Sequence, residues 1–300
     1  NAKKSRLIYG CMGLGGSWDG PDYTQADVDL AAEALHAAAD IGITTIDTAD
    51  IYRQTGSEAV IGEVLSRDPE LRATFEIQTK CGILPGWDGG PTRYNLSGRY
   101  ITESIAGALD RLQVDSIDVM ILHRPDPLMR PDDIANALGA ALDSGIIKSW
   151  GVSNMGPWQL EYLKDVPGQA ACNQIDLGLR ARSFVEQAMS APATASQGSL
   201  YPAGTVEYCA AHGIDVQAWS PMAQGVYSAL PGTPSAEGRT PEHLETFELV
   251  RQFATAHRTT PETIVLWWLT HHPAGIRPVI GTTNVARIHA CADANNRDSG

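Results

Sequence analysis

Short apolar runs alternate along the chain with longer stretches in which apolar residues recur at helical spacing. The short runs are bounded by polar residues or glycine, which is typical of buried β-strands. They predict eight strands, at residues 7–12, 43–47, 75–80, 117–122, 148–152, 171–175, 214–218 and 278–281.

The longer stretches predict amphipathic helices between these strands. Residues 27–41 place Val28, Ala31, Leu35 and Ala38 on one stripe, after a Thr24-x-x-Asp27 capping box and before a terminating Gly42. Residues 97–112 repeat the pattern. Further helices are predicted at 57–66, 132–144, 157–164, 203–212, 242–256, 261–270 and 284–292.

Eight β-then-α units in 300 residues predict a (β/α)8 TIM barrel, for which ~250 residues is typical. An open doubly wound sheet is the alternative, because a count of units does not prove closure. No linker or shift in composition divides the chain, so residues 1–300 are interpreted as one domain. Three long connections, at 82–96, 177–202 and 222–240, are expected at the C-terminal ends of the strands, where barrel enzymes build their active sites.

The composition narrows the class of protein. With 43% hydrophobic residues the chain can bury a sizeable core, and its 22 Lys and Arg against 35 Asp and Glu give a net charge of −13. That excess disfavours nucleic acid and anionic membranes as partners. The apolar runs are shorter than the ~20 residues of a membrane span. Five scattered cysteines without a CxxC motif favour a reducing, cytoplasmic setting over a disulfide framework.

Familiar short motifs are incomplete. The segment from Gly13 to Trp18 begins like GxGxxG but has Trp at the third glycine position, and Gly151–Met155 lacks the last glycine of GxSxG. There is no HExxH motif, and no metal site is expected.

Ionisable residues stand at the ends of three successive predicted strands. Asp47 ends the second strand and Tyr52 follows it, Lys80 ends the third, and His123 follows the fourth. In a barrel these four side chains would meet at the mouth. An ammonium near a phenol favours the phenolate, so Lys80 is expected to lower the pKa of Tyr52 and make it a proton donor for a carbonyl oxygen. A structural Asp–Lys pair beneath a loop is the simpler alternative.

The order of the motifs resembles the aldo-keto reductase family, in particular the bacterial oxidoreductase branch with a Leu-His-Arg-Pro-Asp segment. The resemblance covers nearly the whole chain. It is carried by DTADIY (47–52), TK (79–80), LHRPD (122–126), GVSN (151–154), NQ (173–174), AWSPMAQG (218–225) and GTTNVARI (281–288). It implies Tyr52 as general acid, Lys80 and Asp47 as the pair that tunes its pKa, and His123 as the group that orients the carbonyl.

The same resemblance implies an NADP(H) cofactor. Ser153, Asn154 and Gln174 match groups that bind the nicotinamide carboxamide, and Trp219 matches an aromatic ring stacked on the nicotinamide. The segment with Ser220, Pro221, Met222 and Gly225 matches the part that wraps the pyrophosphate. The remaining residues of the implied set are Met12, Asp47, Gly281, Thr282, Thr283 and Arg287.

Cofactor choice is expected to depend on Arg287 and Thr282, together with the start of a short helix, through the 2′-phosphate of NADP. Many family members have Lys where this chain has Gly281, so the preference for NADP is expected to be weakened but not reversed. Family members also continue with another helix and a C-terminal substrate loop, so part of the pocket wall is expected to lie beyond this sequence.

The expected function is NADPH-dependent reduction of an aldehyde or ketone, with a small carbonyl compound as the partner and a monomer favoured. Two alternatives stay open at this point. Lys80 could be the nucleophile of a Schiff-base aldolase. The chain could instead be a redox-sensing module that holds NADP(H) with little turnover. Arg124 could attract a substrate carboxylate, although an ion pair with Asp126 is the expected arrangement.

Overall fold

A closed ring of parallel strands forms the centre of the molecule. The computed structural model describes residues 4–87, 89–189, 202–229 and 233–296. The strands follow the order β1–β10–β9–β8–β7–β6–β3–β2, and β1 pairs with β10 through Ile8 and Val279, which closes the barrel and excludes the open sheet. They are β1 (Ile8–Gly10), β2 (Thr45–Asp47), β3 (Glu76–Cys81), β6 (Ile117–Leu122), β7 (Ile147–Ser153), β8 (Cys172–Asp176), β9 (Asp215–Trp219) and β10 (Arg277–Ile280).

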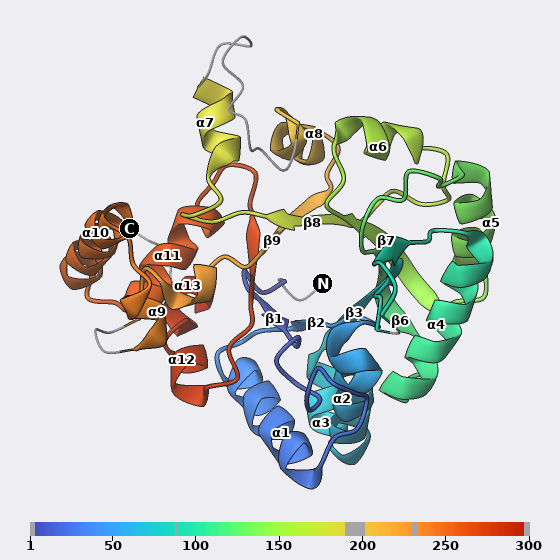
Figure 1. Ribbon diagram of the computed structural model, residues 1–300, viewed down its shortest axis with the longest axis horizontal. Coiled ribbons are helices and arrows are strands. Elements are labelled where there is room, and N and C mark those ends of the chain that lie inside the picture. Colours follow the sequence, from blue (N-terminus) through green and yellow to red (C-terminus); the bar gives the residue numbers. More distant parts are fainter. Residues whose placement is uncertain (1–3, 88, 190–201, 230–232, 297–300) are drawn as a thin grey trace.

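Helices surround the strands on all sides, so the structure is a single α/β domain with the predicted TIM-barrel architecture (Figure 1). Each predicted helix except the one at 284–292 is present within a few residues. The helices are α1 (Gln25–Asp40), α2 (Gly56–Arg67), α3 (Pro69–Thr74), α4 (Gly98–Leu112), α5 (Pro131–Asp143), α6 (Pro157–Tyr162), α7 (Ser183–Met189), α8 (Thr205–Ala211), α9 (Pro234–Glu237), α10 (Pro241–His257), α11 (Pro261–Thr270), α12 (Val285–His289) and α13 (Ala292–Asn296).

Local chemistry explains where these helices begin and end. The predicted capping box of α1 is confirmed, because the Thr24 backbone N–H donates to Asp27 Oδ2 at 2.8 Å, and Gly42 follows the helix at a φ of +81°. The single helix predicted at 284–292 is wrong, because the chain breaks into α12 and α13. The backbone carbonyl of Ala290 accepts hydrogen bonds from the Thr260 and Thr263 hydroxyls at this break.

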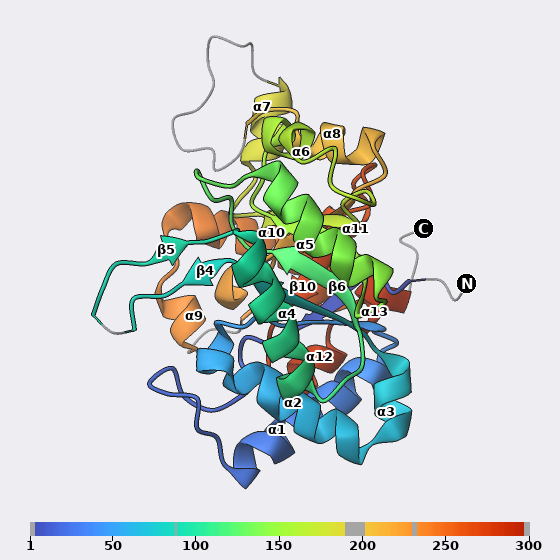
Figure 2. The ribbon, with the colours of Figure 1, turned by 90° about the vertical axis from the view of Figure 1, so that its right-hand side faces the viewer.

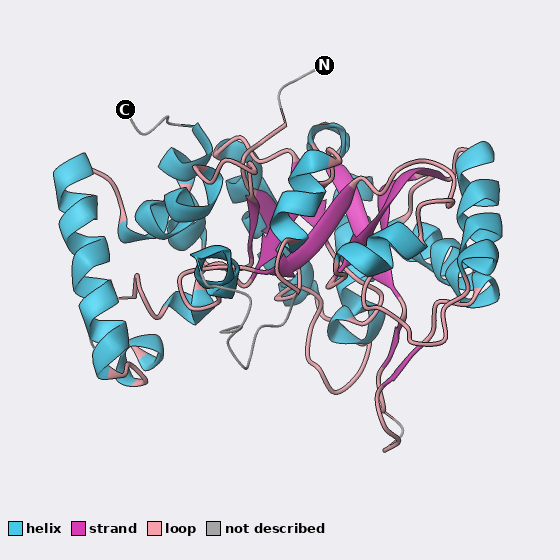
Figure 3. Ribbon diagram, turned by 90° about the horizontal axis from the view of Figure 1, so that it is seen from above, coloured by secondary structure: helices cyan, strands magenta, loops and turns pink. Residues whose placement is uncertain are grey.

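Each of the three long connections contains short helices or strands. The connection at 82–96 contains a hairpin of β4 (Ile83–Leu84) and β5 (Arg93–Tyr94). The connection at 177–202 contains α7, and its residues 190–201 lie outside the described part of the chain. The connection at 222–240 contains α9. The hairpin and α9 project on the side opposite both termini, at the mouth of the barrel (Figures 2 and 3).

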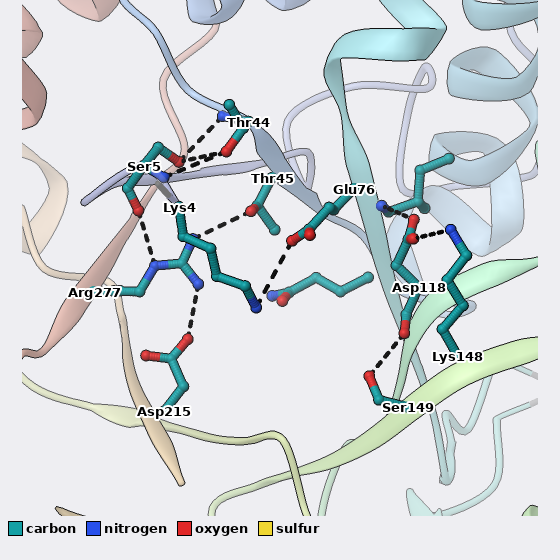
Figure 4. Close-up of polar contacts among 12 residues, drawn as sticks. Lys4, Ser5, Thr44, Thr45, Glu76, Asp118, Lys148, Ser149, Asp215 and Arg277 are labelled. Atoms are coloured by element: carbon teal, nitrogen blue, oxygen red, sulfur yellow. Dashed lines mark hydrogen bonds and ion pairs between the residues drawn. The ribbon is translucent and has the colours of Figure 1, made fainter. Parts of the chain in front are cut away.

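The opposite end of the barrel is closed by polar side chains (Figure 4). Arg277 donates from Nη1 to Asp215 Oδ2 at 2.8 Å, from Nη2 to Thr45 Oγ1 at 3.1 Å, and from Nε to the Ser5 carbonyl at 3.0 Å. This end therefore has a structural role, and the chemistry of the site lies at the mouth.

Two structural features relate to the expected reducing setting: the state of the cysteines and the apolar character of the helices. All five cysteines are described, and each is free and buried. Among the described residues, no helix combines the length and the apolar character that a bilayer span requires.

Candidate active site

A cavity of about 570 Å³ opens at the C-terminal ends of the strands. It brings together most of the residues singled out from the sequence: Met12, Asp47, Tyr52, His123, Ser153, Asn154, Gln174, Trp219, Ser220, Pro221, Met222, Gly225, Gly281, Thr282 and Arg287. Lys80 lies behind this lining and reaches it through Tyr52. Thr283 is not part of the lining.

Tyr52 is held by a strained turn between β2 and α2. The three residues that follow it, Arg53, Gln54 and Thr55, have φ values of 51°, 52° and 78°, a region that non-glycine residues rarely adopt. Arg53 Nε donates to the Met12 carbonyl at 3.1 Å, and Gln54 Nε2 donates to the Trp18 carbonyl at 2.8 Å. These bonds to the β1–α1 loop offset the strain and fix the Tyr52 ring at the mouth.

Two glycines allow the β1–α1 loop and this turn to touch. A Cβ atom on Gly15 would lie 2.4 Å from the backbone of Gly56, and one on Gly56 would lie 2.5 Å from the Gly15 carbonyl oxygen. Ser57 Oγ then donates to the Cys11 carbonyl at 2.9 Å. Any side chain at Gly15 or Gly56 would separate the loops and move Tyr52.

A chain of buried polar contacts lies beneath the Tyr52 hydroxyl. Lys80 Nζ is 3.1 Å from Tyr52 Oη and 2.6 Å from Asp47 Oδ2, and it also donates to the Thr48 carbonyl at 2.9 Å. Burial alone would lower the pKa of Lys80, but Asp47 and Tyr52 raise it well above its usual value. Lys80 is therefore an ammonium with all three hydrogens in use.

The expected low pKa of Tyr52 is wrong in its net direction. Burial raises the pKa of Tyr52 above its ordinary value, and the opposing effect of the Lys80 ammonium does not overcome it, partly because Asp47 acts in the same direction as burial. Tyr52 is consequently protonated at neutral pH. This is the state that a proton donor needs, and Lys80 would stabilise the phenolate left after transfer.

His123 faces Tyr52 across the cavity. The two rings are edge to face, with centroids 6.0 Å apart. Burial and the nearby charges of Lys80 and Arg124 lower the pKa of His123 well below its usual value, so the imidazole is neutral. Its Nδ1 atom is buried without a hydrogen-bond partner in the described part of the chain. A neutral imidazole next to a phenol can donate one N–H to a carbonyl oxygen.

Amide and hydroxyl groups from β7 and β8 form the next part of the wall. Ser153 Oγ donates to the Gln174 carbonyl at 2.7 Å and accepts from Asn154 Nδ2 at 2.7 Å. Trp219 Nε1 donates to Asn154 Oδ1 at 3.0 Å, which fixes the indole ring against the cavity. Asn154 and Ser220 have φ values of 61° and 53°, so the backbone is strained where β7 and β9 reach the site.

Another part of the cavity lining carries the charged residues Arg287 and Glu262. Arg287 is exposed, and it forms no ion pair with a described residue. Asn284 caps the short helix α12 by accepting from the Arg287 backbone N–H at 3.0 Å. The amide groups, the flat indole and the exposed Arg287 guanidinium form a set of groups that fits the carboxamide, ring and phosphate of a nicotinamide dinucleotide.

The structure corrects the expected pairing of Arg124 and adds two residues, Ile51 and Ile83, that sequence reasoning missed. Arg124 is not paired with Asp126 as expected, because Asp126 accepts from the backbone N–H groups of Leu96 and Leu128. The Arg124 guanidinium instead lies 5.9 Å from the Trp219 ring centre and lines the cavity. Ile51 and Ile83 add apolar wall. Their signal was weak, because both follow strand ends in segments rich in other candidates.

Two curated proteins are similar to this chain over most of its length. Each is called 6-dehydroglucose reductase. The one from Agrobacterium fabrum is 32% identical over 297 residues, which are 97% of this chain and 88% of that protein. The one from Novosphingobium aromaticivorans is 35% identical over 272 residues, 88% of this chain and 80% of that protein.

Solved structures of low sequence identity share the fold. A glycerol dehydrogenase from Gluconobacter oxydans has a TM-score of 0.78 at 21% identity, covering 96% of this chain and 86% of that chain. An aldo/keto reductase from Klebsiella pneumoniae, in complex with NADP and acetate, has a TM-score of 0.72 at 22% identity, covering 97% and 86%. The model of the Aldo/keto reductase family matches residues 6–298, almost the whole barrel with its cavity, and the chain therefore belongs to that family of oxidoreductases.

Proposed function

We propose that this protein reduces an aldehyde or ketone to an alcohol with NADPH, and that Tyr52 is the general acid. The observation that carries the proposal is the contact between Tyr52 Oη and Lys80 Nζ at 3.1 Å, with Lys80 in turn 2.6 Å from Asp47 Oδ2, at the floor of a cavity also lined by His123. A protonated phenol supported by a buried ammonium suits protonation of a carbonyl oxygen.

Each side chain of the cavity has a separate role in the proposed reaction. Bound NADPH would supply the hydride to the carbonyl carbon. Tyr52 donates its proton to the carbonyl oxygen, and the Lys80 ammonium stabilises the phenolate that results. Asp47 keeps Lys80 charged and in place, and neutral His123 orients the carbonyl oxygen. Ser153, Asn154, Gln174 and Trp219 would hold the nicotinamide, while Arg287 and Thr282 would bind the 2′-phosphate.

The contacts of Lys80 argue against the Schiff-base alternative. Its side chain is fully buried, its three hydrogens are donated to protein atoms, and its raised pKa leaves no free amine to attack a carbonyl. The redox-sensing alternative differs in turnover rather than in the residues of the site, so rapid release of NADP from the enzyme would distinguish the reductase from it.

The relatives and the residues of the cavity suggest two classes of substrate. The relatives called 6-dehydroglucose reductase are named for a sugar-derived carbonyl compound, which makes aldehydes of sugars candidates here. Arg124 adds a positive charge that forms no ion pair with a described residue, and Ile51 and Ile83 add apolar surface. A short aldehyde bearing a carboxylate is therefore a second candidate class.

The direct test is NADPH oxidation with a panel of aldehydes, ketones, diketones and sugar-derived aldehydes. The proposal predicts turnover with at least one class, and no trapping of substrate on Lys80 by borohydride when nicotinamide is absent. Trapping on Lys80, or turnover of carbonyl compounds without any nicotinamide, would contradict it.

A further inference from the structure

Three glutamine side chains lie inside the barrel beneath the site. Gln78, Gln174 and Gln217 come from β3, β8 and β9 and are only 1%, 2% and 2% exposed. The register explains their meeting. Asp47 is paired with Gln78 across β2 and β3, and Gln174 with Gln217 across β8 and β9. The barrel interior thus has a polar layer where branched apolar residues usually dominate.

The hydrogen bonds of this layer form a closed set. Asp47 Oδ1 accepts from Gln78 Nε2 at 2.7 Å and from Gln174 Nε2 at 2.9 Å. Gln217 Oε1 accepts from the same two nitrogens, at 2.8 and 3.1 Å. Gln217 Nε2 donates to Gln78 Oε1 at 3.1 Å and lies 3.4 Å from Asp215 Oδ2, the carboxylate paired with Arg277.

These partners determine which way each amide faces. The Asp47 carboxylate is bound to the Lys80 ammonium and can only accept, so the amide nitrogens of Gln78 and Gln174 must point to it. Both hydrogens of Gln174 Nε2 are then used, one by Asp47 and one by Gln217. A reversed Gln174 amide would place its oxygen against two buried acceptors, which is costly. Because Gln174 also lines the cavity, the group left for a ligand is its oxygen.

We propose that Gln217 is a positioning residue that locks the Gln174 amide so that it presents an acceptor to the NH₂ of the nicotinamide carboxamide. Gln217 is not among the residues that line the cavity. It acts from behind, by occupying the second hydrogen of Gln174 and holding Gln78 on Asp47. The inference rests on the proposed function, since it takes the nicotinamide to bind at Gln174.

The proposal predicts how the protein distinguishes cofactor analogues. In the 3-acetylpyridine analogue of NADP a methyl ketone replaces the carboxamide, so the analogue has no N–H to donate to Gln174. The wild-type protein should bind this analogue about fivefold more weakly than NADP, as expected for loss of one neutral hydrogen bond. In Gln217→Met the Gln174 amide loses one of its two buried acceptors and keeps Asp47, so its orientation is less strongly fixed and the ratio of the two Kd values should fall below that of wild type.

The experiment measures both Kd values from quenching of tryptophan fluorescence, without turnover. Thr45→Val is the matched control, because Thr45 is a buried strand residue that accepts from Arg277 and does not contact Gln174 or Asp47. It should keep the wild-type ratio. If Gln217→Met does not fold, Gln217→Asn, whose shorter amide cannot reach both neighbours, replaces it with the same expected result.

The possible results distinguish failure of the Gln217 role from failure of the proposed reductase function. A ratio in Gln217→Met equal to that of wild type would overturn the role of Gln217. A wild-type ratio near one would overturn the acceptor role of Gln174 while leaving carbonyl reduction intact. If the wild-type protein bound neither dinucleotide, the proposed function itself would fail.

Discussion

At the scale of single residues, the acidity of Tyr52 is a balance between burial and two opposite charges. Burial and Asp47 raise its pKa, and Lys80 lowers it. Alcohol oxidation, the reverse reaction, needs the phenolate as a base, so its rate should rise with pH towards the pKa of Tyr52. Removing either charge should shift that rise, in opposite directions.

Lys80→Met removes the charge that lowers the pKa, so the rising limb of kcat/KM for alcohol oxidation should move to higher pH, by about 1–3 units. Asp47→Asn removes a charge that raises the pKa of Tyr52, so the rising limb should move to lower pH. The loss of rate should be smaller than in Lys80→Met. The measurement is the pH profile of each variant. Profiles that coincide with that of wild type would exclude electrostatic tuning of Tyr52.

Arg287 tests cofactor choice. A charge-assisted hydrogen bond is worth ~1.5–3 kcal/mol, so Arg287→Ala should weaken NADPH binding roughly tenfold or more and leave NADH almost unchanged. Arg258→Ala is the control, because Arg258 is an exposed arginine outside the cavity lining. Equal losses for both cofactors, or no loss for either, would mean that the 2′-phosphate is recognised elsewhere.

At the scale of elements, the turn after β2 contacts α4 through Asp50, a half-buried carboxylate. Asp50 Oδ2 accepts from the Tyr100 hydroxyl at 3.3 Å, while Asp50 Oδ1 has no hydrogen-bond partner in the described part of the chain. Burial, with repulsion from Glu58, raises the pKa of Asp50 to about 7. In the unfolded chain this pKa is about 3.9. The folded state therefore keeps a proton that the unfolded state releases, and this group makes stability fall as pH rises from about 4 to about 7.

Asp50→Asn should remove that dependence. The variant should gain thermal stability over wild type as the pH is raised from 5 to 8, because the neutral amide no longer has to be ionised inside the protein. Asp110→Asn, which removes an exposed carboxylate from α4, is the control and should follow wild type. If the difference in Tm between Asp50→Asn and wild type were the same at every pH, Asp50 would not hold this proton.

Elements were predictable where the hydrophobic pattern is long enough to recognise. The β-strands are apolar runs bounded by polar residues or glycine, and the longer helices show a helical period. A capping residue adds to that period in α1, α4, α10 and α11. Helix α3 was missed although Asp68 caps it, accepting from the Leu71 N–H at 2.9 Å, because six residues are too few to show a period. The β4–β5 hairpin was missed because glycine and proline between its strands are typical of loops. The break between α12 and α13 depends on threonines of a distant segment, so no local pattern shows it.

At the scale of the whole molecule, closure of the barrel turns scattered strand ends into one site. The four residues at strand ends could be predicted, because parallel strands bring their C-terminal ends together. The glutamines of the interior could have been noticed, since Gln78 stands two residues before Lys80 and faces the same way. Their hydrogen bonds could not, because these depend on register across the barrel. The net direction of the Tyr52 pKa also required the folded structure, since burial is not visible in a motif.

The most direct test of the central claim is hydride transfer in a single turnover by Tyr52→Phe, using a carbonyl compound that the wild-type enzyme reduces. If Tyr52 is the general acid, the rate should fall roughly 10²–10⁴-fold or more, the usual contribution of a general acid, while the Kd for NADPH stays within about twofold. A single-turnover rate within a factor of about two or three of wild type would show that the proton comes from another group, and the role of Tyr52 would have to be abandoned.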